Sequence, residues 1–318
     1  MSESAANPLS PNQRAWRRFF RNRPAQVGLA FLGLLLLVVL LWPLGRCQPI
    51  ANWLPAAMTH HPDQFTGAQF EPPNRRHWCG TDVHGRDQLA RILYGARISL
   101  LVGAAGAGVA LVIGVFWGAV AGYLGGHWDA LMMRWVDILY ALPSIVFVIV
   151  LITTLETVVK AWITDRLGPQ AATAVRLLFL FVGLGAVSWL TMARIVRGQV
   201  MTLRTRPFVD AARAMGASHA HILWRHLIPN TLGVIIVYLT LTVPSVILYE
   251  SFLSYLGLGI QPPMASWGSL IAEGAQQLNP IRIYWWLLIF PALTLITTLL
   301  ALNFVGDGLR DAFDPRAE

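Results

Sequence analysis

The sequence predicts an all-α integral membrane protein with six transmembrane helices and both termini on the inner side. Of its 318 residues, 55% are hydrophobic and only 13% are charged, which is about half the usual share. The mean hydropathy is +0.54. Six stretches of 17 to 31 residues carry no charged side chain, and each can cross a hydrocarbon core of about 30 Å as a helix. This composition excludes an ordinary cytosolic enzyme, a disordered tail and a small disulfide-stapled domain.

The uncharged stretches define the expected elements in chain order. These are a basic inner tail at 1–23, a first transmembrane helix at 24–45, an outer segment at 46–97, a five-helix core at 98–306 with an inner loop at 193–230, and an inner tail at 307–318. The stretches lie between Arg23 and Arg46, Arg97 and Asp129, Asp137 and Glu156, Arg176 and Arg194, Arg225 and Glu250, and Arg282 and Asp307. The third and fourth are the shortest, so their flanking charges must extend toward the membrane surface.

A further uncharged stretch, between Glu250 and Glu273, is as long as the first but is not expected to cross the membrane. Gly257, Pro262 and Pro263 would break a helix there, and backbone groups exposed to lipid cost several kcal/mol each. We therefore expect a loop or a partly re-entrant segment.

The first stretch has a competing interpretation as a cleaved signal peptide, because a basic region precedes its apolar run. The run is long for a signal peptide, and no small-residue cleavage motif follows Leu44. Arg46 directly before Cys47 disagrees with a lipoprotein signal. We expect an uncleaved membrane anchor.

The distribution of basic residues sets the expected orientation. With the N-terminus inside, the inner segments hold 14 of the 24 basic residues and the outer segments hold nine, and Arg176 lies at a boundary. Cytoplasmic segments carry the excess of Lys and Arg in membrane proteins. The net charge of +8 comes from these arginines. Because basic residues beside membrane spans contact anionic lipid headgroups, the charge does not require a nucleic acid partner, and none is expected.

Several kinds of catalytic site are absent from the sequence. A phosphate-binding P-loop requires a lysine within G-x-x-x-x-G-K-[ST], and the one lysine, Lys160, lies in Val-Val-Lys-Ala. Nucleophile elbows and zinc-protease motifs are missing as well. The histidine pairs His60–His61 and His219/His221 lack partners at metal-ligand spacing. We expect no enzymatic activity, no metal and no cofactor in this chain, and any use of ATP requires a separate subunit.

Other titratable side chains give two further expectations. Asp137, Glu156 and Glu250 fall at the edges of the predicted spans, which disfavours a proton- or ion-coupled carrier. Cys47 and Cys79 both lie in the outer segment, where a disulfide and two free thiols remain equally compatible with the sequence.

The second stretch contains Gly114, Gly118 and Gly122, which repeat every four residues. Small residues at this spacing lie on one face of a helix and allow a second helix to approach closely. We expect these glycines to serve helix packing.

The inner loop contains a short amphipathic helix. Thr205 can cap it, Pro207 suits its first turn, Asp210 lies near the positive end of its dipole, and Gly216 suits the position after its end. Its apolar positions are Phe208, Ala211, Ala212 and Met215. A helix of about ten residues is marginal in water, so its apolar face needs a partner. The pattern leaves open whether that partner is another protein, the membrane surface or the same chain. Ser218 can cap a second helix that runs through Pro229 into the fifth span.

The residues Asp210-Ala211-Ala212, Gly216 and Pro229 resemble the E-A-A-x3-G-x9-I-x-L-P loop in permease subunits of bacterial ABC importers. Asp210 replaces the glutamate, and His226 and Ile228 replace the isoleucine and leucine. Further similar segments are Gly80–Asp87, Gly95–Leu100, Met192–Gln199, Glu250–Gly259 and Asn303–Asp311. Over about residues 14 to 315 the chain resembles the second, C-type permease subunit of oligopeptide and dipeptide importers.

The resemblance implies a type I importer permease fold in the bacterial inner membrane. It implies pairing with a second permease subunit, two cytosolic ATPases that carry ATP and Mg²⁺, and an external solute-binding protein that delivers a peptide. The loop at 205–229 would contact an ATPase through Pro207, Phe208, Asp210, Ala211, Ala212, Met215, Gly216 and Pro229. For the outer mouth of the translocation path we expect Glu250, Pro263, Ser266, Trp267 and Gly268.

Two alternatives remain open at this point. Relatives of this class carry nickel, glutathione or peptide antibiotics, so the cargo can differ from a peptide. A scaffold or assembly factor that does not transport, and that uses the loop as an adaptor, is also compatible with the sequence.

Overall fold

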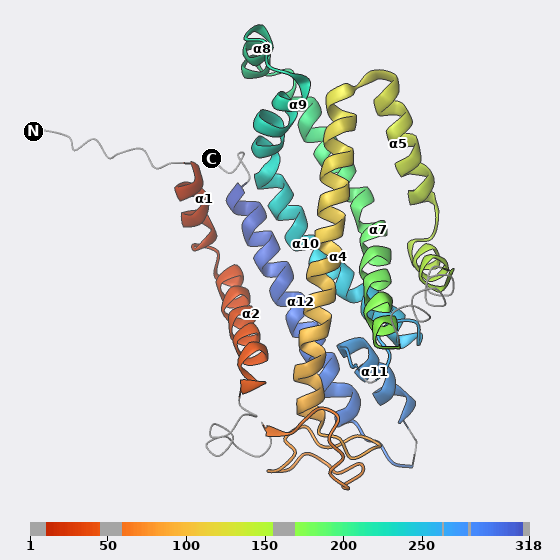
Figure 1. Ribbon diagram of the computed structural model, residues 1–318. Coiled ribbons are helices and arrows are strands. Elements are labelled where there is room, and N and C mark those ends of the chain that lie inside the picture. Colours follow the sequence, from red (N-terminus) through yellow and green to blue (C-terminus); the bar gives the residue numbers. More distant parts are fainter. Residues whose placement is uncertain (1–10, 45–58, 155–168, 263, 279–280, 314–318) are drawn as a thin grey trace, which may run out of the picture.

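Long apolar helices make up most of the structure (Figure 1). The computed structural model describes residues 11–44, 59–154, 169–262, 264–278 and 281–313. Its helices are α1 Pro11–Phe19, α2 Arg23–Leu41, α4 Gln88–Leu124, α5 Gly126–Ala141, an unlabelled helix Ser144–Thr154, α7 Pro169–Leu203, α8 Pro207–Ala214, α9 His219–His221, α10 Ile228–Tyr255, α11 Trp267–Gln276 and α12 Trp286–Phe313. A π-helical segment, Ile222–Leu227, joins α9 to α10.

Five helices in the described ranges are long and apolar enough to cross a membrane. They are α2, α4, the part of α7 from Leu178 to Leu203, the continuous helix from His219 to Tyr255, and α12. A bent pair of helices, Gly126–Ala141 and Ser144–Thr154, brings the number to six if the pair forms one span. The all-α membrane fold predicted from the sequence is therefore confirmed.

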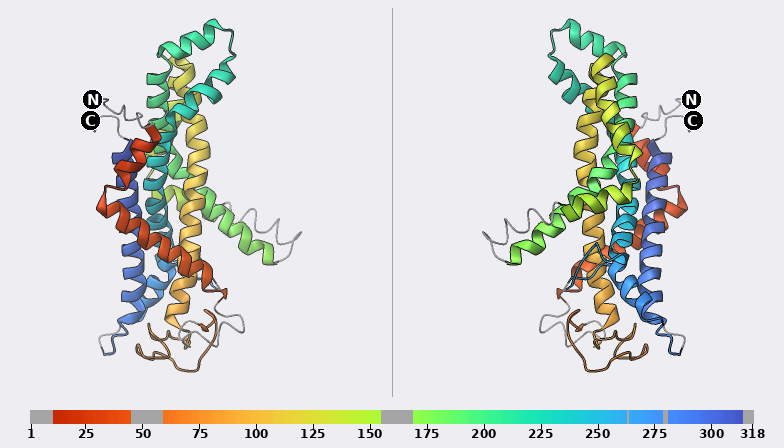
Figure 2. Two further views of the ribbon diagram at one scale, coloured as in Figure 1. Left: turned by 90° about the vertical axis from the view of Figure 1, so that its left-hand side faces the viewer. Right: turned by 90° about the vertical axis from the view of Figure 1, so that its right-hand side faces the viewer.

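The third uncharged stretch differs from the expected straight helix. Its two helices meet at an angle of 92°, with the break at Leu142 and Pro143. Proline disfavours helical geometry at the residue before it, and Leu142 has an extended backbone with a ψ of 137°. The stretch is therefore not one continuous helix, although the bent pair can still form the sixth span. Figure 2 shows the yellow-green segment after the break leaving the bundle sideways.

The second span begins ten residues before the expected position, at Gln88 and not at residue 98. Asp87 caps it, because its carboxylate accepts a hydrogen bond of 2.8 Å from the N–H of Ala90. Arg97, whose charge set the earlier boundary, lies within this helix, as does Arg91. The helix begins directly after its N-cap and not at the charge nearest to the apolar stretch.

The stretch after Glu250 does not cross the membrane, as the sequence predicted. After α10 the chain forms a loop and then α11, whose 10 residues span about 15 Å. Figure 1 places α11 beside the lower ends of α4 and α12, at the same end as the outer segment. Its N-cap, Ser266, forms a reciprocal capping pair with Ser269.

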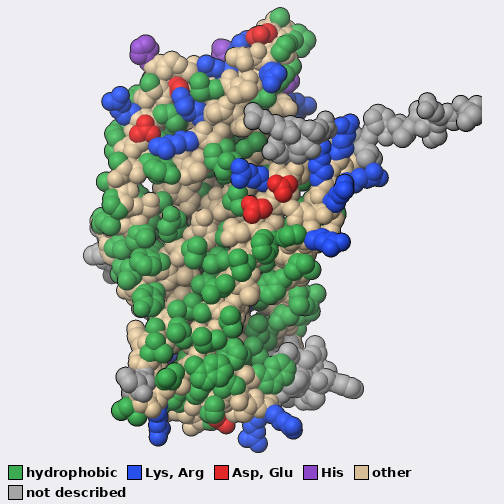
Figure 3. Space-filling model, turned by 180° about the vertical axis from the view of Figure 1, so that it is seen from behind, with side chains coloured by type: hydrophobic (Ala, Val, Ile, Leu, Met, Phe, Trp, Pro, Cys, Tyr) green, Lys and Arg blue, Asp and Glu red, His purple; other side chains and the backbone are tan. Residues whose placement is uncertain are grey.

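The N-terminal helix α1 packs against the C-terminal end of α12. Phe19 and Ala15 are buried with Ala312. Asn22 caps α2 and also donates a hydrogen bond of 3.3 Å to Asp311. The two ends of the described chain therefore lie on the same side of the bundle, as expected. Figure 3 shows an apolar band across the middle of the molecule, with most charged side chains toward its two ends.

Candidate functional site

The helix α8 stands at one tip of the bundle, above α4, α7 and α10 (Figure 1). Pro207 occupies its first turn, and its N-cap is Arg206, which forms no side-chain capping bond. The expected cap, Thr205, instead donates a hydrogen bond to the carbonyl of Thr202, so that expectation was wrong. Gly216 follows the helix with a φ of +81°, a conformation that other residues rarely adopt. The N–H of Ala217 donates to the carbonyl of Ala212, which completes a Schellman ending.

The two faces of α8 have different environments. Val209 and Ala212 are buried against Ile222, Leu223 and Leu227 of the same chain. The side chains on the other face, Phe208, Ala211 and Met215, are exposed, and Met215 is 82% exposed. The structure thus supports packing on the same chain for one face and leaves a second, largely apolar face without cover among the described residues.

Asp210 lies beside the exposed face. Its side chain is 68% exposed, and its Oδ1 accepts a hydrogen bond of 3.2 Å from Nη1 of Arg213, three residues on. An exposed pair of this kind contributes well under 1 kcal/mol to stability. The carboxylate is therefore available to a partner at almost no cost to the fold.

Close contacts between α4 and α7 hold the base of this loop. Gly114, Gly118 and Gly122 of α4 lie against α7. A Cβ added at Gly114 would collide with the side chain of Met192. At Gly118 and Gly122 an added Cβ would collide with the backbone carbonyls of Ala193 and Arg197, respectively. Arg204, at the end of α7, donates to the carbonyls of Gly122 and Tyr123 at 3.1 and 3.2 Å. The loop therefore begins from a rigid helix pair.

Pro229 lies inside a continuous helix. Proline lacks an N–H and its ring collides with the carbonyl four residues before it, which breaks an ideal α-helix. The π-helical turn Ile222–Leu227 directly precedes it and widens the backbone there. Asn230 also donates a hydrogen bond of 2.6 Å to the carbonyl of His226. The loop thus continues into α10 through helical backbone, which is unbroken from His219 to Tyr255.

A polar hollow lies among the membrane helices. It has a volume of about 280 Å³. Its lining includes Tyr140, Ser144, Ser188, Thr191, Tyr238, Thr242, Ser245 and Tyr249, from α5, the helix Ser144–Thr154, α7 and α10. Thr242 and Ser245 donate to carbonyls of their own helix, which leaves their oxygens free to accept hydrogen bonds. Polar side chains within membrane spans are typical of a substrate path.

The residues expected at an outer mouth form a packed junction instead. Glu250 is 0% exposed, and Ser266, Trp267 and Gly268 are buried as well. The Glu250 carboxylate accepts hydrogen bonds from Ser254 at 2.6 Å and Ser99 at 3.4 Å. Glu250 therefore joins α10 to α4 inside the protein and does not lie at an exposed span edge. Pro263 lies outside the described residues.

Two family descriptions match the chain. Residues 114–318 match the binding-protein-dependent transport system inner membrane component. The chain belongs to this permease family. Residues 10–73 of the permease match the N-terminal transmembrane domain of oligopeptide transport permease C. It is a multi-pass protein of the bacterial inner membrane, and its family has the type I importer fold.

Named relatives agree with this assignment. The permease is 46% identical to the oligopeptide transport system permease protein OppC of Escherichia coli (strain K12), over 96% of this chain and 91% of that protein. It is 47% identical to OppC of Salmonella typhimurium, over 96% and 91%. It is 40% identical to the dipeptide transport system permease protein DppC of Bacillus subtilis, over 99% and 89%. The sequence-based resemblance to C-type permease subunits is confirmed.

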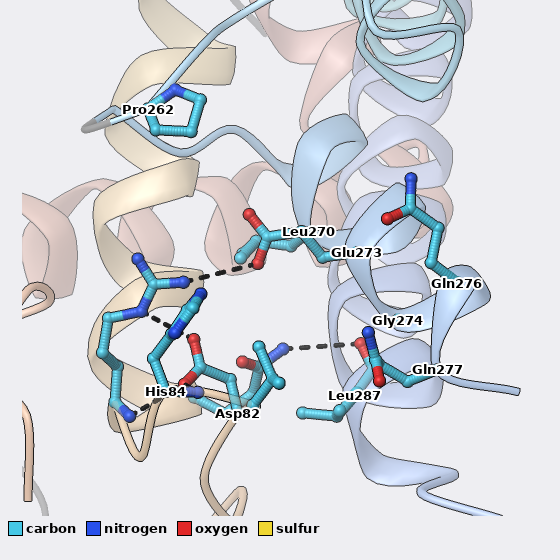
Figure 4. A pocket seen from close by; sticks show the side chains of 12 residues that line it. Asp82, His84, Pro262, Leu270, Glu273, Gly274, Gln276, Gln277 and Leu287 are labelled. Atoms are coloured by element: carbon cyan, nitrogen blue, oxygen red, sulfur yellow. Dashed lines mark hydrogen bonds and ion pairs between the residues drawn. The ribbon is translucent and has the colours of Figure 1, made fainter.

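At the end of the bundle opposite α8, the permease contains a charged pocket of about 380 Å³ between residues 82–88, α11 and α12. Figure 4 shows Asp82 and Glu273 entering it from different elements. Arg91, 4% exposed, donates to Asp82 at 2.9 Å and to both oxygens of Glu273. Arg86 contacts the same two carboxylates. This network ties α11 to the start of α4, and Glu273 lies 182 residues from Arg91, too far for spacing alone to reveal.

Sequence reasoning also missed two other groups of residues in the permease. The hydroxyl side chains at Tyr238, Thr242, Ser245 and Tyr249 recur at helical spacing, so this signal was present in the sequence. His60 has no partner at metal-ligand spacing in the sequence, but in the structure it lies beside His77 and Asp87. No sequence signal connects these three residues.

Cys79 of the permease is a free thiol, and Cys47 lies outside the described residues. Burial, helped by the negative charge of Asp87, raises the pKa of Cys79 to about 12. The thiolate is the reactive form of cysteine, and an ordinary thiol has a pKa near 8.5. At neutral pH Cys79 is therefore almost entirely protonated.

We expect Cys79 to react with maleimide more than about a hundredfold more slowly than an unfolded thiol at pH 7.5, because its thiolate fraction is so small. The measurement is the labelling rate in a Cys47→Ser background, with the same protein in denaturing detergent as control. Equal rates in the two samples would contradict the buried thiol.

Proposed function

We propose that this chain is the permease subunit of an ATP-driven importer of oligopeptides or dipeptides. It forms half of the translocation path and connects to an ATPase through the loop at 205–229. The observation that carries this proposal is α8: a short helix, held firmly by Val209 and Ala212, that presents Phe208, Ala211 and Met215 to a partner. The peptide cargo is supported by the names of the OppC and DppC relatives.

The proposed ATPase partners follow from the missing P-loop sequence and from the exposed face of α8. It contains no P-loop sequence, so ATP and Mg²⁺ belong to two separate ATPase subunits and catalysis is not its own role. Shifting a two-state pore from 1:99 to 99:1 requires about 5.5 kcal/mol of differential interaction. A helix bound along one face in a cleft of an ATPase subunit can transmit such an energy. The exposed face of α8, formed by Phe208, Ala211 and Met215, is suited to this contact. A second permease subunit completes the path, and a solute-binding protein delivers cargo to the outer segment.

The hydroxyl-lined hollow is the cargo-facing surface in this proposal. Peptides carry backbone donors and acceptors that must be satisfied when they leave water. Serine, threonine and tyrosine hydroxyls offer both donors and acceptors without a fixed charge. The hollow can therefore accept peptides of varied sequence.

We expect Ser245→Trp to lower peptide uptake to about a tenth or less, because an indole ring occupies much of a 280 Å³ hollow. The measurement is uptake of a labelled peptide into proteoliposomes that contain the complete transporter. ATP hydrolysis should persist, since α8 is unchanged. Ile236→Trp is the matched control, because Ile236 is exposed nine residues earlier and on the opposite face of α10. Equal loss in both variants would remove the hollow from the path.

Co-purification tests the proposal as a whole. The chain should bring down a second permease and two ATPases, and ATP hydrolysis should rise when a loaded binding protein is added. A scaffold would not show this rise. Mass spectrometry of the ligand on the binding protein distinguishes a peptide from nickel, glutathione or a peptide antibiotic, and a ligand other than a peptide would overturn the cargo assignment.

A further inference from the structure

Three potential metal ligands meet in the outer segment, in front of the first turn of α4. They are His60, His77 and Asp87, and their ligand atoms all lie within 4.8 Å of one another. Nδ1 of His77 is 2.7 Å from Oδ2 of Asp87, and Nδ1 of His60 is 3.8 Å from the same oxygen. The two imidazole rings lie 4.9 Å apart. Elsewhere in the described ranges no group of three such side chains comes as close.

One ring nitrogen of His60, Nδ1, lacks a hydrogen-bond partner among the described residues. Nδ1 of His60 is buried, and none of the described residues lies within hydrogen-bond distance of it. Asp87 and His77 are almost fully buried, and the His60 side chain is 18% exposed. A buried polar atom without a partner is costly, and native proteins usually satisfy such atoms. Nδ1 of His60 lies 3.8 Å from Oδ2 of Asp87, beyond hydrogen-bond distance.

The ligand set and the distances fit one class of ion. Zn²⁺ favours imidazole nitrogen and carboxylate oxygen at about 2.0 to 2.2 Å with tetrahedral geometry, which places two ligands about 3.3 Å apart. The separations of 2.7 and 3.8 Å lie on either side of this value, and the ion would replace the hydrogen bond between His77 and Asp87. The group offers one carboxylate oxygen and two imidazole nitrogens, a ligand set that suits a cation. Mg²⁺ and Ca²⁺ prefer oxygen ligands, so two nitrogens disfavour them.

We propose that His60, His77 and Asp87 bind one Zn²⁺ ion. The fourth position faces the partly exposed side of His60 and is filled by water. Asp87 keeps its second oxygen on the N–H of Ala90, so the ion joins the outer segment to the cap of α4. The ion has a structural role: it holds His60 and the chain around it against the start of the second span. The site does not depend on the transported cargo.

The test uses the full chain in detergent, purified with an affinity tag that contains no histidine and stripped with EDTA. Zn²⁺ is titrated against a competing chromogenic chelator. We expect one tight site per chain, and His60→Ala should weaken it at least tenfold. His61→Ala is the matched control, because His61 is the neighbouring residue, is exposed and lies outside the group; it should bind as the parent does. Saturating Zn²⁺ should also raise the unfolding temperature of the parent by several degrees, and Mg²⁺ should not.

Several outcomes would overturn the proposal. If His60→Ala binds Zn²⁺ as tightly as the parent does, the binding belongs to other histidines, such as His221 and His226, whose rings contact each other away from this site. The same loss in His61→Ala would indicate a nonspecific surface effect. If His60→Ala does not fold, His60→Gln replaces it, and X-ray absorption at the zinc edge of the parent must show two imidazole ligands. A spectrum without imidazole would end the assignment.

Discussion

Asp210→Lys is expected to reduce ATP-driven uptake to about a tenth or less while the subunit still folds and inserts. Asp210 is exposed at the first turn of α8, next to the apolar face formed by Phe208, Ala211 and Met215. In the proposed contact the ATPase surface is complementary to this carboxylate, so a lysine there brings like charges together, which costs several kcal/mol at an interface. Within the subunit itself the change costs only about 0.3 to 1 kcal/mol through the helix dipole. The loss therefore concerns coupling and not stability.

The measurement is peptide uptake in proteoliposomes with the ATPases and the binding protein, beside the amount of folded subunit in the membrane. Arg213→Ala is the matched control, because it removes the intrahelical ion pair but keeps the carboxylate. We expect this variant to transport at a rate near that of the parent. Normal uptake by Asp210→Lys, or an equal loss in Arg213→Ala, would contradict the contact assigned to Asp210.

Gly118→Leu is expected to destabilise the subunit by at least about 3 kcal/mol, because its side chain meets backbone that cannot move aside. A Cβ at Gly118 already collides with the carbonyl of Ala193 on α7. The helix pair must separate to admit a larger side chain, and the contacts of Gly114 and Gly122 are lost with it. The measurement is the unfolding temperature of the purified chain in detergent.

Gly108→Leu provides the control for this variant. Gly108 lies in the same helix, and a Cβ there meets nothing within 4 Å. The two variants add the same apolar group and remove the same flexible residue, so their difference isolates the helix contact. An equal unfolding temperature for both would show that the approach of α4 to α7 does not require glycine at position 118.

Much of the fold could be predicted because transmembrane helices are set by local hydropathy. The cap of the second loop helix is also local: Ser218 accepts a hydrogen bond from the N–H of His221, as expected. The break in the third stretch was predictable in principle, since Pro143 was visible, but a count of uncharged residues does not register a proline. The start of α4 also has a local signal, the N-cap Asp87, but a boundary placed at the charge of Arg97 does not take account of a cap. The pairing of Arg91 with Glu273 was not predictable in this way, because the two residues lie 182 positions apart in the chain.

The sequence by itself determined the positions and order of the apolar stretches, the start and end of α8 within a residue or two, and the family. Hydropathy and capping act over one or two helical turns, so they can be read along the chain. Only the tertiary structure decided which face of α8 stays exposed, that Glu250 is buried among serines, and that His60 meets His77 and Asp87. These features depend on contacts between residues that are distant in sequence, and such contacts exist only after the helices have packed.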